Sequence, residues 1–271
     1  MTCRREWENE TSQYVTYLQA YNVENRISGI MVYSGDCNSI GDQVGATWLF
    51  TYDGDGNKVK QVYTVGGVDT TTYYFAGGSY EVESDGTTET STQYYSIGGM
   101  SIAMKKGSEL NYFLTDHLGS VVGITDGDGA LTSETRYTPF GEVREDIGSI
   151  SETDFGYTYQ KVITGSGLMD YKARFYDASI GRFIQPDTLV PGAGSSQGYN
   201  RYGYALNNPI KYSDPSGHKA CSGSSSGGDC YVDSSWLLNK LGKSTIQKPI
   251  AGPSTWISQS PSVPFTVRVQ T

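Results

Sequence analysis

This sequence of 271 residues has few of the side chains that build metal and redox sites, with only four cysteines and two histidines. The cysteines form no Cys-x-x-Cys pair, so we expect no zinc site, no other metal and no cofactor. No apolar run approaches the roughly 18 residues that span a bilayer. The first residues are basic and then acidic with no apolar stretch after them, which does not fit a secretory signal peptide.

Charge is also sparse. Charged residues make up 18% of the chain and the net charge is -9, which argues against a nucleic-acid backbone as the main partner of the body of the protein. Glycine and tyrosine are abundant instead, with 34 and 22 residues. Together with Thr and Val, this composition favours many short strands joined by tight turns.

A short repeat recurs along the chain, in which an aromatic residue precedes a polar turn and then a basic and a branched residue. Its copies are YNVENRI (21–27), YDGDGNKV (52–59), FYDASIGRF (175–183) and the weaker ITDGDGAL (124–131). Asp, Asn and Gly tolerate the left-handed conformations of hairpin turns, so each copy predicts a strand, a tight turn and a strand.

Strand patterns fill the intervals between these copies, and helical patterns are scarce. The predicted strands are 47–52, 58–65, 71–76, 80–83, 92–97, 101–105, 111–115, 121–125 and 131–137. We therefore expect residues 44–145 to form an antiparallel meander with less than about 15% helix. The only helical patterns are 198–206, predicted to form a short helix, and 234–241.

The composition changes abruptly after His218. The next residues are rich in Ser and Gly, and four prolines are scattered through the last part of the chain. We expect residues 219–232 to be mobile, because such a sequence buries too little apolar surface to offset its ordering entropy. Cys221 and Cys230 bracket this segment, and they form either a disulfide in an oxidising compartment or two free thiols.

Five motifs between residues 112 and 218 carry a resemblance to a known family. They are YFLTDHLGS (112–120), YTPFGE (137–142), YKARFYD (171–177) with GRF (181–183), NRYGY (200–204) with NNP (207–209), and DPSGH (214–218). In this order they resemble the core domain that closes RHS and YD-repeat proteins, the polymorphic-toxin and wall-associated carriers of bacteria. The resemblance divides the chain into YD-repeat-like hairpins (12–111), an RHS repeat-associated core domain (112–218) and a variable tail (219–271).

The resemblance implies an all-β fold, in which a ribbon of hairpins forms part of a hollow shell and a C-terminal segment is held inside or released. The expected partners are the remainder of a larger shell, the chain's own C-terminal segment, and an immunity protein or a cell-surface ligand. The implied location is secreted or at the cell surface, as the C-terminal piece of a longer protein. A shell or delivery scaffold is the first function expected, and a cell-surface adhesive or carbohydrate-binding module is an alternative from another class.

A second alternative is self-cleavage, the one enzymatic activity that the resemblance implies. Aspartyl proteolysis needs one ionised and one protonated carboxyl group near the scissile bond. Asp187 and Asp214 lie in the paired motifs of the family, and the scissile bond would lie next to His218. The motifs depart from the toxin pattern at Thr188 and at His218 and resemble the wall-associated branch. The competing interpretation is that both aspartates only form turns.

Three other groups of residues resemble functional sites, and for each a structural role is the better interpretation. His117 follows Asp116 in an expected turn between strands. The loops DGDGN (53–57) and DGDG (126–129) look like calcium loops but lack the bidentate Glu at position 12. Arg174 and Arg182 could orient carboxylates, although pairing with aromatic or acidic residues of a neighbouring strand is the commoner use.

Overall fold

The computed structural model is built almost entirely from antiparallel strands, as the Tyr, Thr and Gly content predicts. It describes residues 2–8, 12–97, 100–147, 150–189 and 196–222. These residues belong to one unit, Met1–Trp236, and a second unit, Leu237–Thr271, lies outside the described residues. Within the described ranges, no helix is long and apolar enough to cross a membrane.

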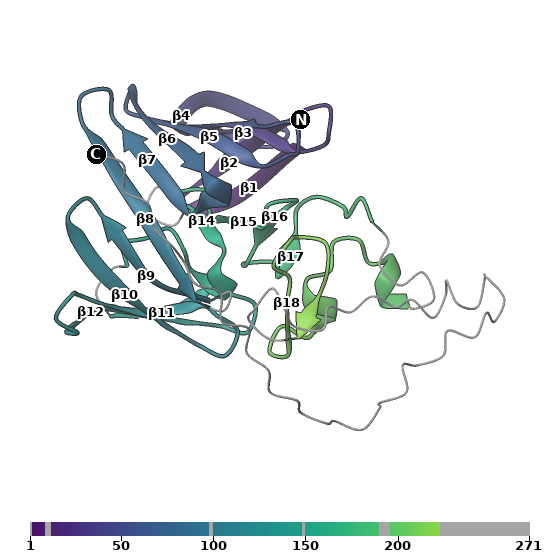
Figure 1. Ribbon diagram of the computed structural model, residues 1–271. Helices are drawn as coiled ribbons and strands as arrows, with labels where there is room; N and C mark the ends of the chain where they lie inside the picture. The colour runs from purple at the N-terminus through teal and green to yellow at the C-terminus, as the bar shows by residue number, and fades with distance from the viewer. Residues whose placement is uncertain (1, 9–11, 98–99, 148–149, 190–195, 223–271) are drawn as a thin grey trace. The chain divides into compact units, whose positions relative to one another are not determined.

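Thirteen strands of the described residues form one sheet in sequence order, which we call the wall. Each strand pairs antiparallel with the next, so the wall is a continuous meander (Figure 1). The strands are β1 (Thr2–Glu8), β2 (Gln13–Tyr21), β3 (Ile27–Asp36), β4 (Ser39–Tyr52), β5 (Lys58–Val65), β6 (Val68–Phe75), β7 (Tyr80–Ser84), β8 (Glu89–Ile97), β9 (Met100–Lys106), β10 (Glu109–Thr115), β11 (Val121–Thr125), β12 (Leu131–Tyr137) and β13 (Val143–Ile147).

The repeated turns share one hydrogen-bond pattern, which gives the aspartate of the repeat its physical reason. The Oδ1 atom of Asp53 accepts hydrogen bonds from the backbone amides two and four residues ahead, at 3.0 and 2.8 Å. Asn22, Asp116 and Asp126 use the same pattern in their own turns. A side chain that satisfies two turn amides fixes the hairpin locally, so the register of each strand pair follows from the sequence of the turn.

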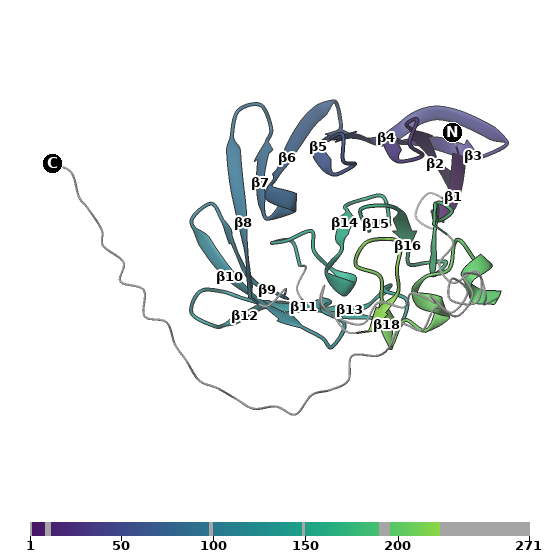
Figure 2. The same cartoon turned by 45° about the vertical axis from the view of Figure 1, so that its right-hand side comes forward.

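Inside the wall lies a small four-stranded sheet, which we call the inner sheet (Figure 2). It comprises β14 (Lys161–Ile163), β15 (Leu168–Asp170), β16 (Phe175–Asp177) and β17 (Arg182–Phe183). A two-stranded sheet follows, β18 (Tyr212–Ser213) with β19 (Cys221–Ser222). The 3-10 turns are η1 (Ala76–Gly78), η2 (Tyr157–Tyr159), η3 (Ser196–Tyr199) and η4 (Ala205–Asn207).

Apolar side chains of the wall pack directly on the inner sheet. Trp48 and Phe50 on β4 belong to the same buried cluster as Leu168 on β15 and Phe175 on β16. The rings of Phe50 and Phe175 lie 5.5 Å apart. A buried aromatic side chain removes on the order of 150–250 Å² from water, so these contacts are a main source of cohesion between the two sheets.

Two buried lysine ion pairs also join the wall to the inner sheet. Lys58 on β5 lies 2.7 Å from Asp170 on β15, and Lys161 on β14 contacts Glu81 on β7. The side chains of both pairs are about a tenth exposed or less. Burial lowers the pKa of Lys161 and raises the pKa of Glu81, so this pair bears a desolvation cost that its own attraction must offset.

The predicted antiparallel meander is confirmed, and its predicted strands correspond to β4–β12. Strands 58–65, 121–125 and 131–137 have the predicted bounds. Of the two predicted helices, 198–206 consists instead of η3 and η4 with a turn between them, because Leu206 and its neighbours take left-handed backbone angles. The second, 234–241, lies outside the described residues, as does most of the expected mobile segment 219–232.

The wall runs without a break through the predicted boundary at 111/112, and β1 precedes residue 12, where the hairpin segment was expected to begin. The division into 12–111, 112–218 and 219–271 stays a prediction.

The pairing of the cysteines was not predicted from the sequence. Cys3 and Cys37, which the sequence analysis did not pair, form a disulfide. Cys221 is disulfide-bonded rather than a free thiol, and Cys230 lies outside the described residues.

Candidate functional site

The structure brings the two predicted aspartates to one buried arginine. Arg174 Nη2 lies 3.0 Å from Oδ2 of Asp187 and 3.4 Å from Oδ2 of Asp214. His218 closes the group, with Nδ1 at 2.8 Å from Oδ1 of Asp187. The arginine and both carboxylates are at most 5% exposed, and the imidazole is 28% exposed. We call Arg174, Asp187, Asp214 and His218 the exit cluster.

Asp214 uses its two oxygens for two different purposes. Oδ1 accepts hydrogen bonds from the backbone amides of Ser216, His218 and Lys219, at 3.3, 3.0 and 3.0 Å. The bonds two and four residues ahead repeat the pattern of the hairpin turns of the wall. Oδ2 faces Arg174 instead. The turn-forming interpretation of Asp214 is therefore correct for one oxygen, and the other oxygen remains directed into the cluster.

Arg174 ties together segments of the chain that are far apart in sequence. Its Nε donates a hydrogen bond to the carbonyl oxygen of Gly217, and its Nη1 donates to the carbonyl oxygen of Arg201 at 2.9 Å. The guanidinium carbon also lies 3.7 Å from the ring centre of Phe183. The expected uses of this arginine, pairing with acids and with aromatic rings, are thus both present.

The Gly217 position is tight. Its φ of +74° belongs to the left-handed region, and a Cβ atom there would lie 2.7 Å from the carbonyl oxygen of Tyr171. Only glycine meets both demands without strain, which gives the glycine of the DPSGH motif a steric reason. The turn from Asp214 to His218 therefore packs against the loop between β15 and β16, which carries Arg174.

Burial shifts the pKa values of two groups in the cluster. Burial raises the pKa of Asp214 above its ordinary value, although the turn amides and Arg174 act in the opposite direction. Burial also lowers the pKa of Arg174, opposed by Asp187 and Asp214. Two buried carboxyl groups therefore share a single guanidinium, with the His218 imidazole as a further partner of Asp187 and three turn amides as further partners of Asp214.

A small cavity of about 30 Å³ adjoins the cluster, and its lining includes Asn200, Arg201 and all four cluster residues. That volume accommodates a water molecule, which would have several polar partners there. The site therefore holds two carboxyl groups, a polar cavity and a backbone turn whose amide nitrogens lie 3.0 Å from Asp214. General acid-base chemistry on a peptide would require carboxyl groups beside the peptide bond in this way.

The sequence analysis found both aspartates but not the link between Asp187 and His218. The only signal was the histidine at the end of the DPSGH motif. Asp187 reaches the site from the loop after β17, where its backbone amide donates to Arg201 O at 2.9 Å and Arg201 Nε donates back to Asp187 O at 2.6 Å.

The other residues that the sequence analysis considered as functional candidates make structural contacts or lie at the surface. His117 lies in the turn between β10 and β11, with Nε2 at 3.1 Å from the carbonyl oxygen of Ile210. The carboxylates of Asp53 and Asp126 are occupied by their own turn amides. No group of three or more His, Cys, Asp or Glu side chains in the described part of the chain is arranged to hold a metal ion. Arg182 is exposed, with Nη1 at 3.5 Å from Asn200 Oδ1.

Comparisons with known proteins agree with this architecture. The sequence model of the family described as Teneurin YD-shell matches residues 80–210. The tRNA3(Ser)-specific nuclease WapA of Bacillus spizizenii is 29% identical over 175 residues, which cover 62% of this chain and 7% of WapA. Toxin subunit YenC1 of Yersinia entomophaga is 32% identical over 113 residues, which cover 40% of this chain and 11% of YenC1.

The crystal structure of TcdB2-TccC3-Cdc42 has the same fold over the matched region. Its TM-score is 0.62 at 18% identity, and the match covers 74% of this chain and 10% of that chain. The chain thus spans only a small part of the length of each of these three proteins. The meander of Asp-turn hairpins, the family match over residues 80–210 and these likenesses lead to one conclusion: the described part of the chain contains an RHS/YD-repeat shell domain.

Proposed function

We propose that this shell domain is a delivery scaffold whose core domain presents the variable segment that follows it. In a second version of this proposal the core domain also releases the segment. The observation that carries the proposal is the anchoring of the chain just before the composition changes. The amides of Ser216, His218 and Lys219 bind Asp214, and Arg174 binds the Gly217 carbonyl. Pairing of β19 with β18 adds a further hold.

This anchoring matters because it fixes the base of a segment whose own composition gives it little means to fold. The first residues of the segment after His218 are held by the buried, charge-assisted hydrogen bonds of Arg174 and Asp214 rather than by a surface loop. The names of two relatives, a tRNA nuclease and a toxin subunit, support an effector as the kind of segment presented. A larger shell, completed by parts outside this chain, is the proposed partner.

The disulfide between Cys3 and Cys37 supports the proposed location. Disulfides persist in oxidising surroundings and are rare where glutathione and thioredoxin keep thiols reduced. Cys221 is disulfide-bonded as well. We therefore propose that the protein works outside the cytoplasm, as a secreted or cell-surface protein.

Release by self-cleavage is the second candidate, and the convergence of Asp187 and Asp214 favours it. Asp187 would take a proton from a water molecule in the adjoining cavity, and the water oxygen would attack the carbonyl carbon of a peptide bond next to His218. Asp214, whose pKa is raised by burial, would give its proton to the departing amide nitrogen as the C–N bond breaks. The products are one carboxyl end and one amino end.

The test is the fate of the full-length protein on a denaturing gel with intact mass measurement. Self-cleavage predicts a fragment boundary next to His218 that disappears in both Asp187→Asn and Asp214→Asn. Asp126→Asn is the matched control, because Asp126 forms the same turn pattern but has no contact with the cluster. A full-length wild-type protein that stays intact, or normal processing in Asp187→Asn, would leave presentation without cleavage as the function.

A further inference from the structure

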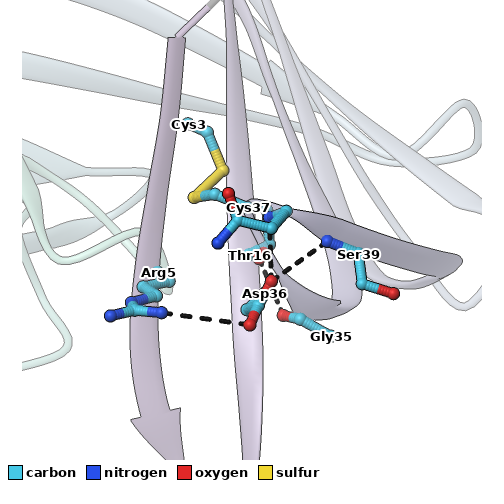
Figure 3. Close-up of a disulfide and its surroundings, with 8 residues drawn as sticks. Cys3, Arg5, Thr16, Gly35, Asp36, Cys37 and Ser39 are labelled. Carbon is cyan, nitrogen blue, oxygen red and sulfur yellow. Dashed lines mark hydrogen bonds and ion pairs between the residues drawn. A yellow bond between two sulfur atoms is a disulfide. The ribbon is translucent and has the colours of Figure 1, made fainter.

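A disulfide fastens the first strand of the wall to a distant turn. Cys3 lies on β1 and Cys37 lies in the turn between β3 and β4, 34 positions later (Figure 3). Cys3 is exposed and Cys37 is half-buried, so a dissolved thiol can reach the bond. Among the described strands β1 pairs only with β2, which makes it an edge strand that depends on additional contacts.

The turn reaches Cys3 because the β3–β4 hairpin bends over the outside of β2. The pairing of β3 with β4 shifts register twice between Met31 and Gly35, and Gly35 has a φ of +87°. Thr16 on β2 donates its hydroxyl hydrogen to the carbonyl oxygen of Gly35 at 2.7 Å. Asp36 lies 3.9 Å from Arg5, on the same side of β1 as Cys3 (Figure 3). The bent hairpin therefore acts as a strap across β2 to β1.

The opposite side of β1 holds the inner sheet. Side chains alternate along a strand, so Arg4 points away from the strap. Its Nη1 lies 2.9 Å from Oδ2 of Asp177 at the end of β16, and its Nη2 donates to the carbonyl oxygen of Ser166. The guanidinium also lies 4.5 Å from the ring centre of Tyr17. The Asp177 side chain is 2% exposed, so its carboxylate depends on Arg4 for charge compensation.

We propose that Cys3–Cys37 is a thiol-exchange site that controls how firmly the wall holds the inner sheet. A thiolate of a small or protein dithiol attacks one cysteine sulfur, forms a mixed disulfide and displaces the other cysteine as a thiolate. The second thiol of the reductant then closes its own disulfide and frees the first cysteine. Two cysteine thiols and one oxidised dithiol result, and the cysteines have gained two electrons.

Reduction of the Cys3–Cys37 disulfide affects the inner sheet through the contacts of Arg4. Once the disulfide is broken, β1 keeps its pairing with β2 and its side-chain contacts with Asp36 and Tyr17 but has no covalent link to the β3–β4 turn, so opening of this edge strand becomes easier. Each opening withdraws Arg4 from Asp177, so the buried carboxylate loses its ion pair and keeps only the hydrogen bonds from the amide and hydroxyl of Ser179. Asp177 lies at the end of β16 and Arg174 of the exit cluster directly precedes that strand, so loosening of β16 acts next to the cluster. The inference does not require the C-terminal segment to be cleaved.

The experiment is amide hydrogen exchange followed by mass spectrometry on the full chain, with and without dithiothreitol. We expect reduction to speed exchange about ten-fold or more in β1 and in β15–β16, and alkylation with mass tags reports reduction of Cys3 and Cys37. The double variant Cys3→Ser/Cys37→Ser should show the fast exchange without reductant. If that variant does not fold, the reduced wild-type protein still gives the answer.

Two further variants separate this site from other effects. Cys221→Ser/Cys230→Ser removes the remaining cysteines and should keep the full response to dithiothreitol. Arg4→Met should speed exchange in β16 with the disulfide intact, and dithiothreitol should then change β16 little further. Exchange in β16 that stays within two-fold after confirmed reduction of Cys3 and Cys37 would overturn the proposal. So would a response that is lost in the Cys221→Ser/Cys230→Ser variant.

Discussion

Replacement of Arg174 by Met tests the physical role of the exit cluster most severely. The side chain is 5% exposed, and its guanidinium contacts both aspartates and the carbonyl oxygens of Gly217 and Arg201. Met keeps much of the apolar stem and removes every one of those contacts. Removing one partner of a buried ion pair costs about 3–5 kcal/mol, because the remaining charge stays buried and uncompensated.

The pH dependence gives this prediction a second signature. Burial raises the pKa of Asp214 and Arg174 opposes that rise, so without Arg174 this carboxyl group holds its proton more tightly in the folded state than in the unfolded state. A group whose pKa is raised by folding contributes stability that is present at low pH and lost as the pH rises. The deficit of Arg174→Met relative to wild type should therefore be smaller at pH 5 than at pH 7.

The assay is urea unfolding of both proteins at the two pH values, followed by far-ultraviolet circular dichroism. Arg182→Met is the matched control, since Arg182 is an exposed arginine of the same segment and should change the free energy of unfolding by less than about 0.5 kcal/mol. A loss of less than about 1 kcal/mol at pH 7 for Arg174→Met would refute the reasoning. A deficit that grows on acidification would refute it as well.

Two further substitutions test the packing around the site and the seam between the sheets. Gly217→Ala should cost about 2 kcal/mol or more in urea unfolding, since the new Cβ would meet Tyr171 O, whereas Gly129→Ala has a similar φ in open space and should cost less. Lys161→Met should cost about 3 kcal/mol by leaving Glu81 buried alone, and the double variant Lys161→Met/Glu81→Leu should recover at least half of that loss in the same assay.

Local turn chemistry made most of the fold predictable. The Asp and Asn residues of the repeats satisfy amides two and four residues ahead, so strand boundaries follow from contacts within each turn. Strand alternation then supplied the all-β class. The packing of the inner sheet against the wall was not predictable in this way, because the pair of Lys58 with Asp170 joins residues more than a hundred positions apart.

The exit cluster was only partly predictable for the same reason. Asp187 and Asp214 stood in recognisable motifs, but their common contact with Arg174 depends on how the inner sheet places that arginine. The disulfide between Cys3 and Cys37 depends on a hairpin that bends over its neighbouring strand. Spacing along the sequence does not reveal that bend, since it arises from register shifts in the pairing of β3 with β4.

The most direct test of the delivery scaffold is protease protection of the segment that follows His218. The full-length protein is treated with a broad-specificity protease, and loss of peptides from that segment is followed by mass spectrometry beside the same segment as an isolated peptide. The account predicts digestion at least about ten-fold slower at residues 219–222 in the full-length protein, because Asp214 and β18 hold the base of the segment. Digestion at the same rate in both samples would contradict the account.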